Sequence, residues 1–161
     1  MESPKPIKRS EELAPLSREH HEGLLFVWKI RQGLKNQTDI NEIARFVQWF
    51  WSTELKRHFQ REETILVPLL KDEPLLLRMM DEHQEIEALI HINEQIADED
   101  LLVKLADTIN DHIRFEERQL FPLVEQKLTP AQLTEAGSRL NVKPEACSPW
   151  PNAFWERKLN L

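Results

Sequence analysis

HFQREETILVPL at residues 58–69 returns along the chain as HIRFEERQLFPL at residues 112–123. Residues i and i+4 of a helix lie on one face, one turn apart. Each copy therefore directs an imidazole and a carboxylate the same way: His58 with Glu62, and His112 with Glu116. Two such pairs that face each other inside a helical bundle would form a cage for two transition-metal ions.

Two more histidines, His20 and His83, share a second repeated setting. Each directly follows a glutamate, Glu19 or Glu82, and precedes another by two residues. All four histidines fall on the apolar stripes of separate amphipathic segments, which is typical of helices that face a common core. The first two helices are therefore expected to be related to the third and fourth by a pseudo-two-fold axis.

Turn and capping residues mark the first two helices. Ser17 is the expected N-cap of the first, which ends near residues 33–36. Asp39 is expected to cap the second in a capping box with Glu42, because a side-chain acceptor stands three residues before a glutamate. Pro68 interrupts this second helix, since proline lacks the N–H that the helix needs.

The remaining helices follow from similar signals. Pro74 suits the first position of the third helix, and the fourth runs from about residue 100 to 127, with Gln119 and Leu123 on its inner stripe. Thr129 is expected to cap a short fifth helix that ends near Gly137. Short connections favour antiparallel neighbours, so we predict an all-α, up-down-up-down four-helix bundle over residues 15–128. A flexible N-terminal arm (1–14) and a short helix with an irregular Pro/Trp-rich tail (129–161) flank it.

Composition narrows the class of protein. The 161 residues are 40% hydrophobic and carry a net charge of −7, without a basic patch, which argues against nucleic-acid and anionic-membrane partners. The single cysteine, Cys147, cannot form an internal disulfide. No signal peptide and no apolar run long enough to span a membrane is present, so we expect a cytoplasmic location.

The six inward residues suit two metal ions rather than one. Histidine and carboxylate together favour iron, manganese or zinc over calcium or magnesium, which prefer all-oxygen sites. Glu62 and Glu116 are the expected bridges between the ions. Glu87 lies one turn after His83 on the predicted inner stripe and is a candidate seventh ligand.

Several residues near the proposed ligands are expected to lie outside the metal site. His21 and His91 are expected at the surface or just outside the site, and Glu63 and Glu117 toward solvent or a neighbouring helix. Glu54 could orient His58, because metal-bound histidines commonly donate their second N–H to a carboxylate. The aromatic residues of this region are expected in the core or at its boundary: Trp28, Trp49, Phe50, Trp51 and Phe59.

The order His, His-x-x-x-Glu, His, His-x-x-x-Glu resembles the hemerythrin-like family, also described as the HHE cation-binding domain. The resemblance covers roughly residues 14–127 and is carried by His20, His58 with Glu62, His83, and His112 with Glu116. Ferritin-like di-iron proteins use the reverse local order, Glu-x-x-His, which is absent at these sites.

The resemblance implies a non-haem centre of two iron ions, oxo- or hydroxo-bridged, with manganese or zinc as alternative metals. His20 and His58 would hold one ion, His83 and His112 the other, and Glu62 and Glu116 would bridge them. Oxygen-carrying members have a further histidine where this chain has Glu87. That departure favours turnover of oxygen or peroxide over reversible storage.

Three functions follow as alternatives. We favour a metal-binding protein that handles or senses a small molecule such as O2, NO or peroxide, or iron itself. A di-iron oxidase or peroxidase-like enzyme of the ferroxidase type is the second, and it would work without a tyrosyl radical because the chain has no tyrosine. A structural bundle with a vestigial metal site is the third. A homodimer or a separate protein partner is left open.

Overall fold

The structure, a computed structural model, describes residues 8–142 and 147–156. Within them all regular secondary structure is helical, which confirms the predicted class. Residues 1–7 of the expected N-terminal arm, and residues 143–146 and 157–161 of the expected tail, lie outside the described residues. In chain order the elements are α1 (Ala14–Lys35), α2 (Ile40–Phe50), the π-helix η1 (Trp51–Leu55), α3 (Lys56–Leu66), the 3-10 helix η2 (Val67–Leu69), α4 (Pro74–Gln95), α5 (Glu99–Phe115), the π-helix η3 (Glu116–Leu120), α6 (Phe121–Lys127) and α7 (Pro130–Leu140).

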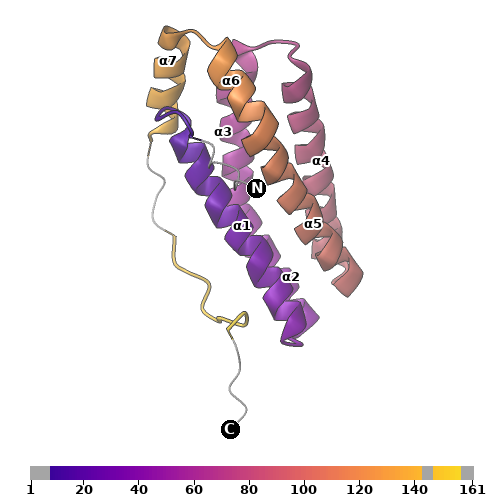
Figure 1. The fold of residues 1–161 in the computed structure, drawn as a ribbon. Coiled ribbons are helices and arrows are strands. Elements are labelled where there is room, and N and C mark those ends of the chain that lie inside the picture. Colours follow the sequence, from indigo (N-terminus) through magenta and orange to yellow (C-terminus); the bar gives the residue numbers. More distant parts are fainter. Residues whose placement is uncertain (1–7, 143–146, 157–161) are drawn as a thin grey trace, which may run out of the picture.

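The elements join into a helical bundle (Figure 1). α2, η1 and α3 follow one another as a single long arm, and so do α5, η3 and α6. α1 contacts α5, α2 and α3, while α4 contacts α5 and α2. α7 packs against α3 and lies beside the start of α1. The bundle therefore brings together the four segments that carry a histidine on their inner stripes.

The helix starts agree with the sequence except at α1. Thr129 caps α7 in a capping box with Gln132. Asp39 caps α2 by accepting from the N–H of Asn41, but the predicted capping box with Glu42 is wrong, because the Glu42 carboxylate accepts from Asn152 instead. The predicted cap at Ser17 is wrong, because α1 begins at Ala14, three residues earlier. Proline is favoured in the first turn of a helix, and Pro15 occupies it here.

The two π-helices change which residues face inward. In η3 the predicted stripe of Gln119 and Leu123 is wrong: Gln119 is exposed and Leu123 half-buried, while Leu120 and Val124 are buried. A π-helical turn closes i→i+5 hydrogen bonds and so adds one residue to the turn. The inner face is therefore reached one residue later than α-helical spacing predicts.

The π-helical turn η1 likewise moves Glu54 away from the inner face. Leu55 is buried and Glu54 only half-buried, although α-helical spacing from Phe50 places Glu54 on the inner stripe. Phe50 and Phe59 are buried, and Trp49 and Trp51 half-buried, as predicted. Trp28, by contrast, is exposed.

Two apolar clusters fill the bundle. The first, here the α2 cluster, includes Phe26, Phe46 and Ile90, and the second, the α7 cluster, includes Leu13, Met79 and Leu120. Along each arm the residues of one cluster precede the histidine and those of the other follow it, apart from Phe59 and Ile113, which directly follow their histidines. A polar layer therefore separates the two clusters.

The C-terminal segment packs back onto the α2 cluster, as the aromatic content of the tail predicts. Phe154 is buried and contacts the ring of Phe46 edge-on. Asn36, which follows α1, donates its side-chain amide to the carbonyl of Phe154. Gly33 permits this approach, because a Cβ there would meet the Phe154 ring at 2.6 Å.

Candidate metal centre

The polar layer consists of the six residues of the two sequence repeats. All of them are buried, and the two carboxylates have no exposed surface. α1 supplies one histidine, α3 a histidine and a glutamate, α4 one histidine, and the junction of α5 with η3 the last pair. The members are His20, His58, Glu62, His83, His112 and Glu116.

The Nε2 atoms of the histidines face the two carboxylates. Within the His-x-x-x-Glu pairs, Nε2 of His58 lies 3.1 Å from Glu62 and Nε2 of His112 lies 2.6 Å from Glu116. Nε2 of His83 lies 3.2 Å from Glu62 and 3.7 Å from Glu116. Nε2 of His20 lies 3.8 Å from Glu62 and 3.7 Å from Glu116.

These buried atoms lack the hydrogen bonds that their burial requires. Among the described residues, the four Nε2 atoms and both oxygens of Glu62 and of Glu116 have no hydrogen-bond partner, despite their short separations. Burial of unpaired polar atoms costs free energy, and of unpaired charges still more. A metal ion would satisfy all of them at once, so the donor set fits a metal.

The ligand atoms fall into two overlapping groups. One contains His20, His58, Glu62 and Glu116, and the other contains Glu62, His83, His112 and Glu116. Within each group the atoms lie within 4.8 Å of one another. Both groups contain the same two glutamates, so each carboxylate is available to two neighbouring ions.

Without a metal, charge attraction dominates the protonation of the layer. Burial alone would lower the pKa of His58, but the charge of Glu62 and the hydrogen bond with Glu19 raise it to about 10. Burial alone would also lower the pKa of His83, but the neighbouring Glu116 and Glu62 raise it to about 11. Burial would raise the pKa of Glu116, but the neighbouring His112 holds it well below its usual range. In the metal-free layer His58 and His83 are therefore held as imidazolium ions beside the glutamates.

A carboxylate faces the other ring nitrogen of each histidine. Glu19 lies 3.0 Å from Nδ1 of His58, and Glu82 lies 2.8 Å from Nδ1 of His112. These equivalent contacts explain why a glutamate precedes the histidine of both α1 and α4. Glu19, and not the predicted Glu54, therefore orients His58.

The second glutamate of each Glu-Glu repeat makes the corresponding contact across the bundle. Glu117 lies 3.2 Å from Nδ1 of His20 and accepts hydrogen bonds from Ser17. Glu63 lies 3.6 Å from Nδ1 of His83, beyond hydrogen-bonding distance. The repeated Glu-Glu dipeptide was the available signal for these two residues, which the sequence placed only toward solvent or a neighbouring helix.

Aromatic rings and a small cavity surround the layer. Phe59 stacks on His83 with centroids 3.8 Å apart, and Phe121 stacks on His20 at 5.1 Å. A cavity of about 30 Å³ reaches His58, lined by Phe50, Leu55 and three glutamates. Its volume is about one water molecule's share of the liquid, so only very small molecules fit beside His58.

Glu87 is not part of the layer, and its predicted place on the inner stripe is wrong. Its side chain is 48% exposed and lies 3.6 Å from Nε2 of His91, also at the surface. The buried face of α4 passes through His83, Ile86 and Ile90, which turns position 87 toward solvent. His21 is exposed as well.

A buried layer of four histidines and two shared carboxylates defines a metal-binding helical bundle. The model of the hemerythrin HHE cation-binding domain matches residues 12–124, and the chain belongs to that family. This confirms the resemblance seen in the sequence. No curated protein and no solved structure matches the chain significantly. In the described part of the chain, no helix is long and apolar enough to cross a membrane.

Proposed function

We propose that the protein binds two iron ions in the polar layer and uses them to bind or sense a small molecule. His20 and His58 hold one ion, and His83 and His112 hold the other. Glu62 and Glu116 bridge the pair, inside four helical arms that run up, down, up and down. The observation that carries this proposal is the sharing of both buried carboxylates between the two groups of ligand atoms.

We propose iron among three metals that the ligand set suits, because the proposed handling of oxygen needs a redox-active ion. Each ion would receive two imidazoles and shared carboxylate oxygens, a mixture that suits iron, manganese and zinc. Such a set leaves coordination positions open to water or to an exogenous ligand. When bound, redox-active iron would supply reversible binding or reduction of oxygen, which zinc cannot supply.

The surroundings limit the partner to a very small molecule such as O2, NO or peroxide. The layer is buried between two apolar clusters, and the cavity beside His58 measures about 30 Å³. The apolar residues Phe50 and Leu55 line it together with carboxylates. A diatomic molecule fits there, whereas an organic substrate does not.

An anaerobic titration with Fe²⁺ tests the proposal. Metal-free protein should take up two ions per chain, measured after desalting. The visible spectrum is then recorded before oxygen is admitted, after it is admitted, and after it is removed. An absorption band that appears with oxygen and fades on its removal supports reversible binding. Protein that takes up no iron would contradict the assignment of the layer as an iron site.

A di-iron oxidase or peroxidase of the ferroxidase type is the second candidate. It is favoured by the outward position of Glu87, because neither ion then has a third imidazole or an extra carboxylate to fill its open positions. Open positions on both ions suit turnover of oxygen or peroxide. The same titration separates the two candidates, since an oxidase would oxidise its iron irreversibly and consume oxygen over many turnovers.

A further inference from the structure

A buried arginine holds the carboxylate partner of His20. Glu117, which faces Nδ1 of His20, accepts a 2.7 Å hydrogen bond at its backbone carbonyl from Arg9. The guanidinium also donates to Glu125 at 2.5 Å and lies over the ring of Phe121, which stacks on His20. Only 8% of the Arg9 side chain is exposed, so water cannot readily replace these contacts.

A second, partly buried arginine does the same for His58. Glu19 accepts a hydrogen bond from Nδ1 of His58 at 3.0 Å and another from Nη1 of Arg61 at 2.7 Å. Nη2 of the same guanidinium donates to the backbone carbonyl of Leu140, the last residue of α7. The Arg61 side chain is 14% exposed. His58 is thus tied through Glu19 and Arg61 to α7.

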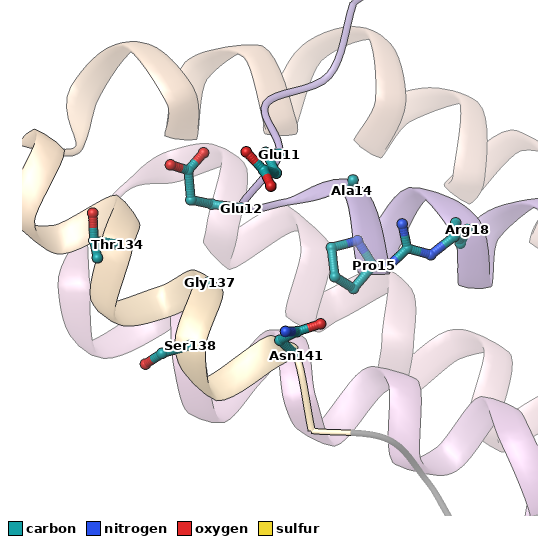
Figure 2. Close-up of a pocket in the computed structure, with 9 residues that line it drawn as sticks. All are labelled: Glu11, Glu12, Ala14, Pro15, Arg18, Thr134, Gly137, Ser138 and Asn141. Atoms are coloured by element: carbon teal, nitrogen blue, oxygen red, sulfur yellow. The ribbon is translucent and has the colours of Figure 1, made fainter.

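α7 itself is fixed against the start of α1. Figure 2 shows Gly137 of α7 beside Glu12, at one side of a surface cavity of about 510 Å³. A Cβ at Gly137 would meet Cγ of Glu12 at 2.9 Å and its Cα at 3.2 Å, so only glycine allows this approach. Ala136 and Leu140 are buried in the α7 cluster. The carbonyl that Arg61 contacts therefore has a defined position.

The other half of the centre lacks this support. Glu82, the partner of His112, accepts from Arg78 at 2.7 Å, but Arg78 is 49% exposed and stands one turn away on the same helix. Nδ1 of His83 has no hydrogen-bond partner in the described part of the chain. Within residues 8–142, neither histidine of this half is tied to the N-terminal segment or to α7.

We propose that Arg9 and Arg61 are positioning residues that make the His20–His58 position the tighter of the two metal positions. This inference rests on the proposed function and adds the order in which the ions bind. Arg9 and the carbonyl of Leu140 both lie outside residues 12–124, the part matched by the family model. The segments that flank the family domain thereby become part of its metal centre.

The physical reason is orientation of the ligands before the ion arrives. A ring held by a carboxylate in its binding orientation loses less freedom on coordination, and the carboxylate makes the imidazole a stronger donor. Loss of such a partner weakens metal binding by about 10- to 100-fold. Arg9 and Arg61 act one contact further out, so we expect about tenfold for each.

Zn²⁺ is the probe for the test, because it is diamagnetic and does not react with oxygen. It is titrated into the metal-free full chain, with calorimetry to resolve two binding steps and imidazole ¹⁵N NMR to show which rings are ligated. In the unaltered protein, His20 and His58 should be ligated at the first equivalent. Arg9→Ala and Arg61→Ala should each weaken the tighter step about tenfold and leave the other step unchanged.

Arg31→Ala is the matched control. It removes an arginine from an exposed ion pair with Asp107, 2.7 Å apart, on the outside of the bundle. Both binding steps should keep their affinities in this variant. Ligation of His83 and His112 first would overturn the inference, as would arginine variants that leave both steps unchanged or weaken both equally. Unaltered protein that takes up neither Zn²⁺ nor Fe²⁺ would instead contradict the proposed function.

Arg9→Lys and Arg61→Lys guard against failure of the alanine variants to fold. Lysine keeps the charge but lacks the planar fork that holds two acceptors at once. Folding is checked by circular dichroism in the presence of a chelator. Folded lysine variants should show a smaller weakening confined to the tighter step, and unaltered affinities in both steps would again overturn the inference.

Discussion

Nε2 of His112 lies 2.6 Å from a carboxylate oxygen of Glu116, across the boundary between α5 and the π-helix η3. The pair is buried, and Glu116 also approaches His20 and His83 from the other side. One carboxylate therefore meets three imidazoles from three helices. Glu62 holds the matching place, near His20, His58 and His83.

His112→Ala is expected to abolish uptake of the ion at the His83–His112 position, and His58→Ala uptake of the ion at the His20–His58 position. Each substitution removes one of the two imidazoles of its own group of ligand atoms. The measurement is the iron-to-protein ratio after anaerobic loading and desalting.

Glu87→Ala is the control for these variants. Because Glu87 lies at the surface beside His91, the Glu87→Ala protein should retain two ions per chain and an unchanged reaction with oxygen. Full metal content in His112→Ala, or loss of iron in Glu87→Ala, would show that the ligands are wrongly assigned.

Metal should bind more tightly as the pH rises. In the metal-free protein the pKa of His58 is about 10 and that of His83 about 11, so both rings are protonated at neutral pH. An imidazole must lose a proton before its Nε2 coordinates, so uptake releases protons. Calorimetry at pH 6–9, in buffers of different ionisation enthalpy, measures both effects. Affinity that does not vary with pH would contradict these protonation states.

Stability of the metal-free protein should depend on pH in the opposite sense. Histidines whose pKa is raised by folding stabilise the protein fully below about pH 6.5, and this contribution is lost as the pH rises through about 10 and 11. The lowered pKa of Glu116 contributes stability above about pH 4.5 that is lost in acid. Urea unfolding with a chelator present should therefore show a maximum between these limits. A maximum in alkali would contradict the charge pairing.

Metal should raise the melting temperature if the layer is a working site. A ligand at 100 times its dissociation constant stabilises the folded state by about 2.7 kcal/mol. For a chain of this size that corresponds to a rise of roughly 5–10 °C. Thermal melts with excess Zn²⁺, and then with a chelator, measure the difference. Identical melts in both conditions would favour the vestigial site.

Leu120→Ala should destabilise the protein by about 2–5 kcal/mol, the usual cost of truncating a buried leucine. Leu120 is fully buried because η3 adds a residue to its turn. Gln119→Ala, at the neighbouring exposed position, should change stability by less than about 0.5 kcal/mol. Urea unfolding of both variants at one pH provides the comparison. The reverse order of effects would mean that the helix keeps α-helical spacing through this turn.

The sequence predicted the helices and the polar layer because both rest on local spacing. A histidine four residues before a glutamate shares its face in any regular helix, and Asp39 and Thr129 cap helices through contacts within a few residues. Spacing fails where the helix is not regular. α-Helical spacing places Gln119 and Glu54 on inner stripes, and nothing in the local sequence marks the π-helical turns that move them outward.

Contacts between distant segments of the chain also could not be predicted from the sequence. Arg9 and Arg61 are ordinary charged residues in the sequence, and their importance arises from Glu125 and Leu140, far along the chain. The predicted inward position of Glu87 was wrong for a related reason. Whether the edge of a helix face is covered depends on the neighbouring helix, and α4 presents Ile86 to the core instead.

The polar layer also lies between two apolar clusters, which we expect to unfold separately in the metal-free protein. Apolar contacts hold the α2 cluster on one side of the layer and the α7 cluster on the other. In the metal-free protein charge pairs and aromatic rings stacked on the histidines lie between them, whereas bound ions would link all four arms. Amide protons in the two clusters should then exchange with solvent as two separate groups without metal and as one cooperative group with it. The bound metal would thus make the two halves of the bundle unfold together, in addition to supplying the chemistry of the site.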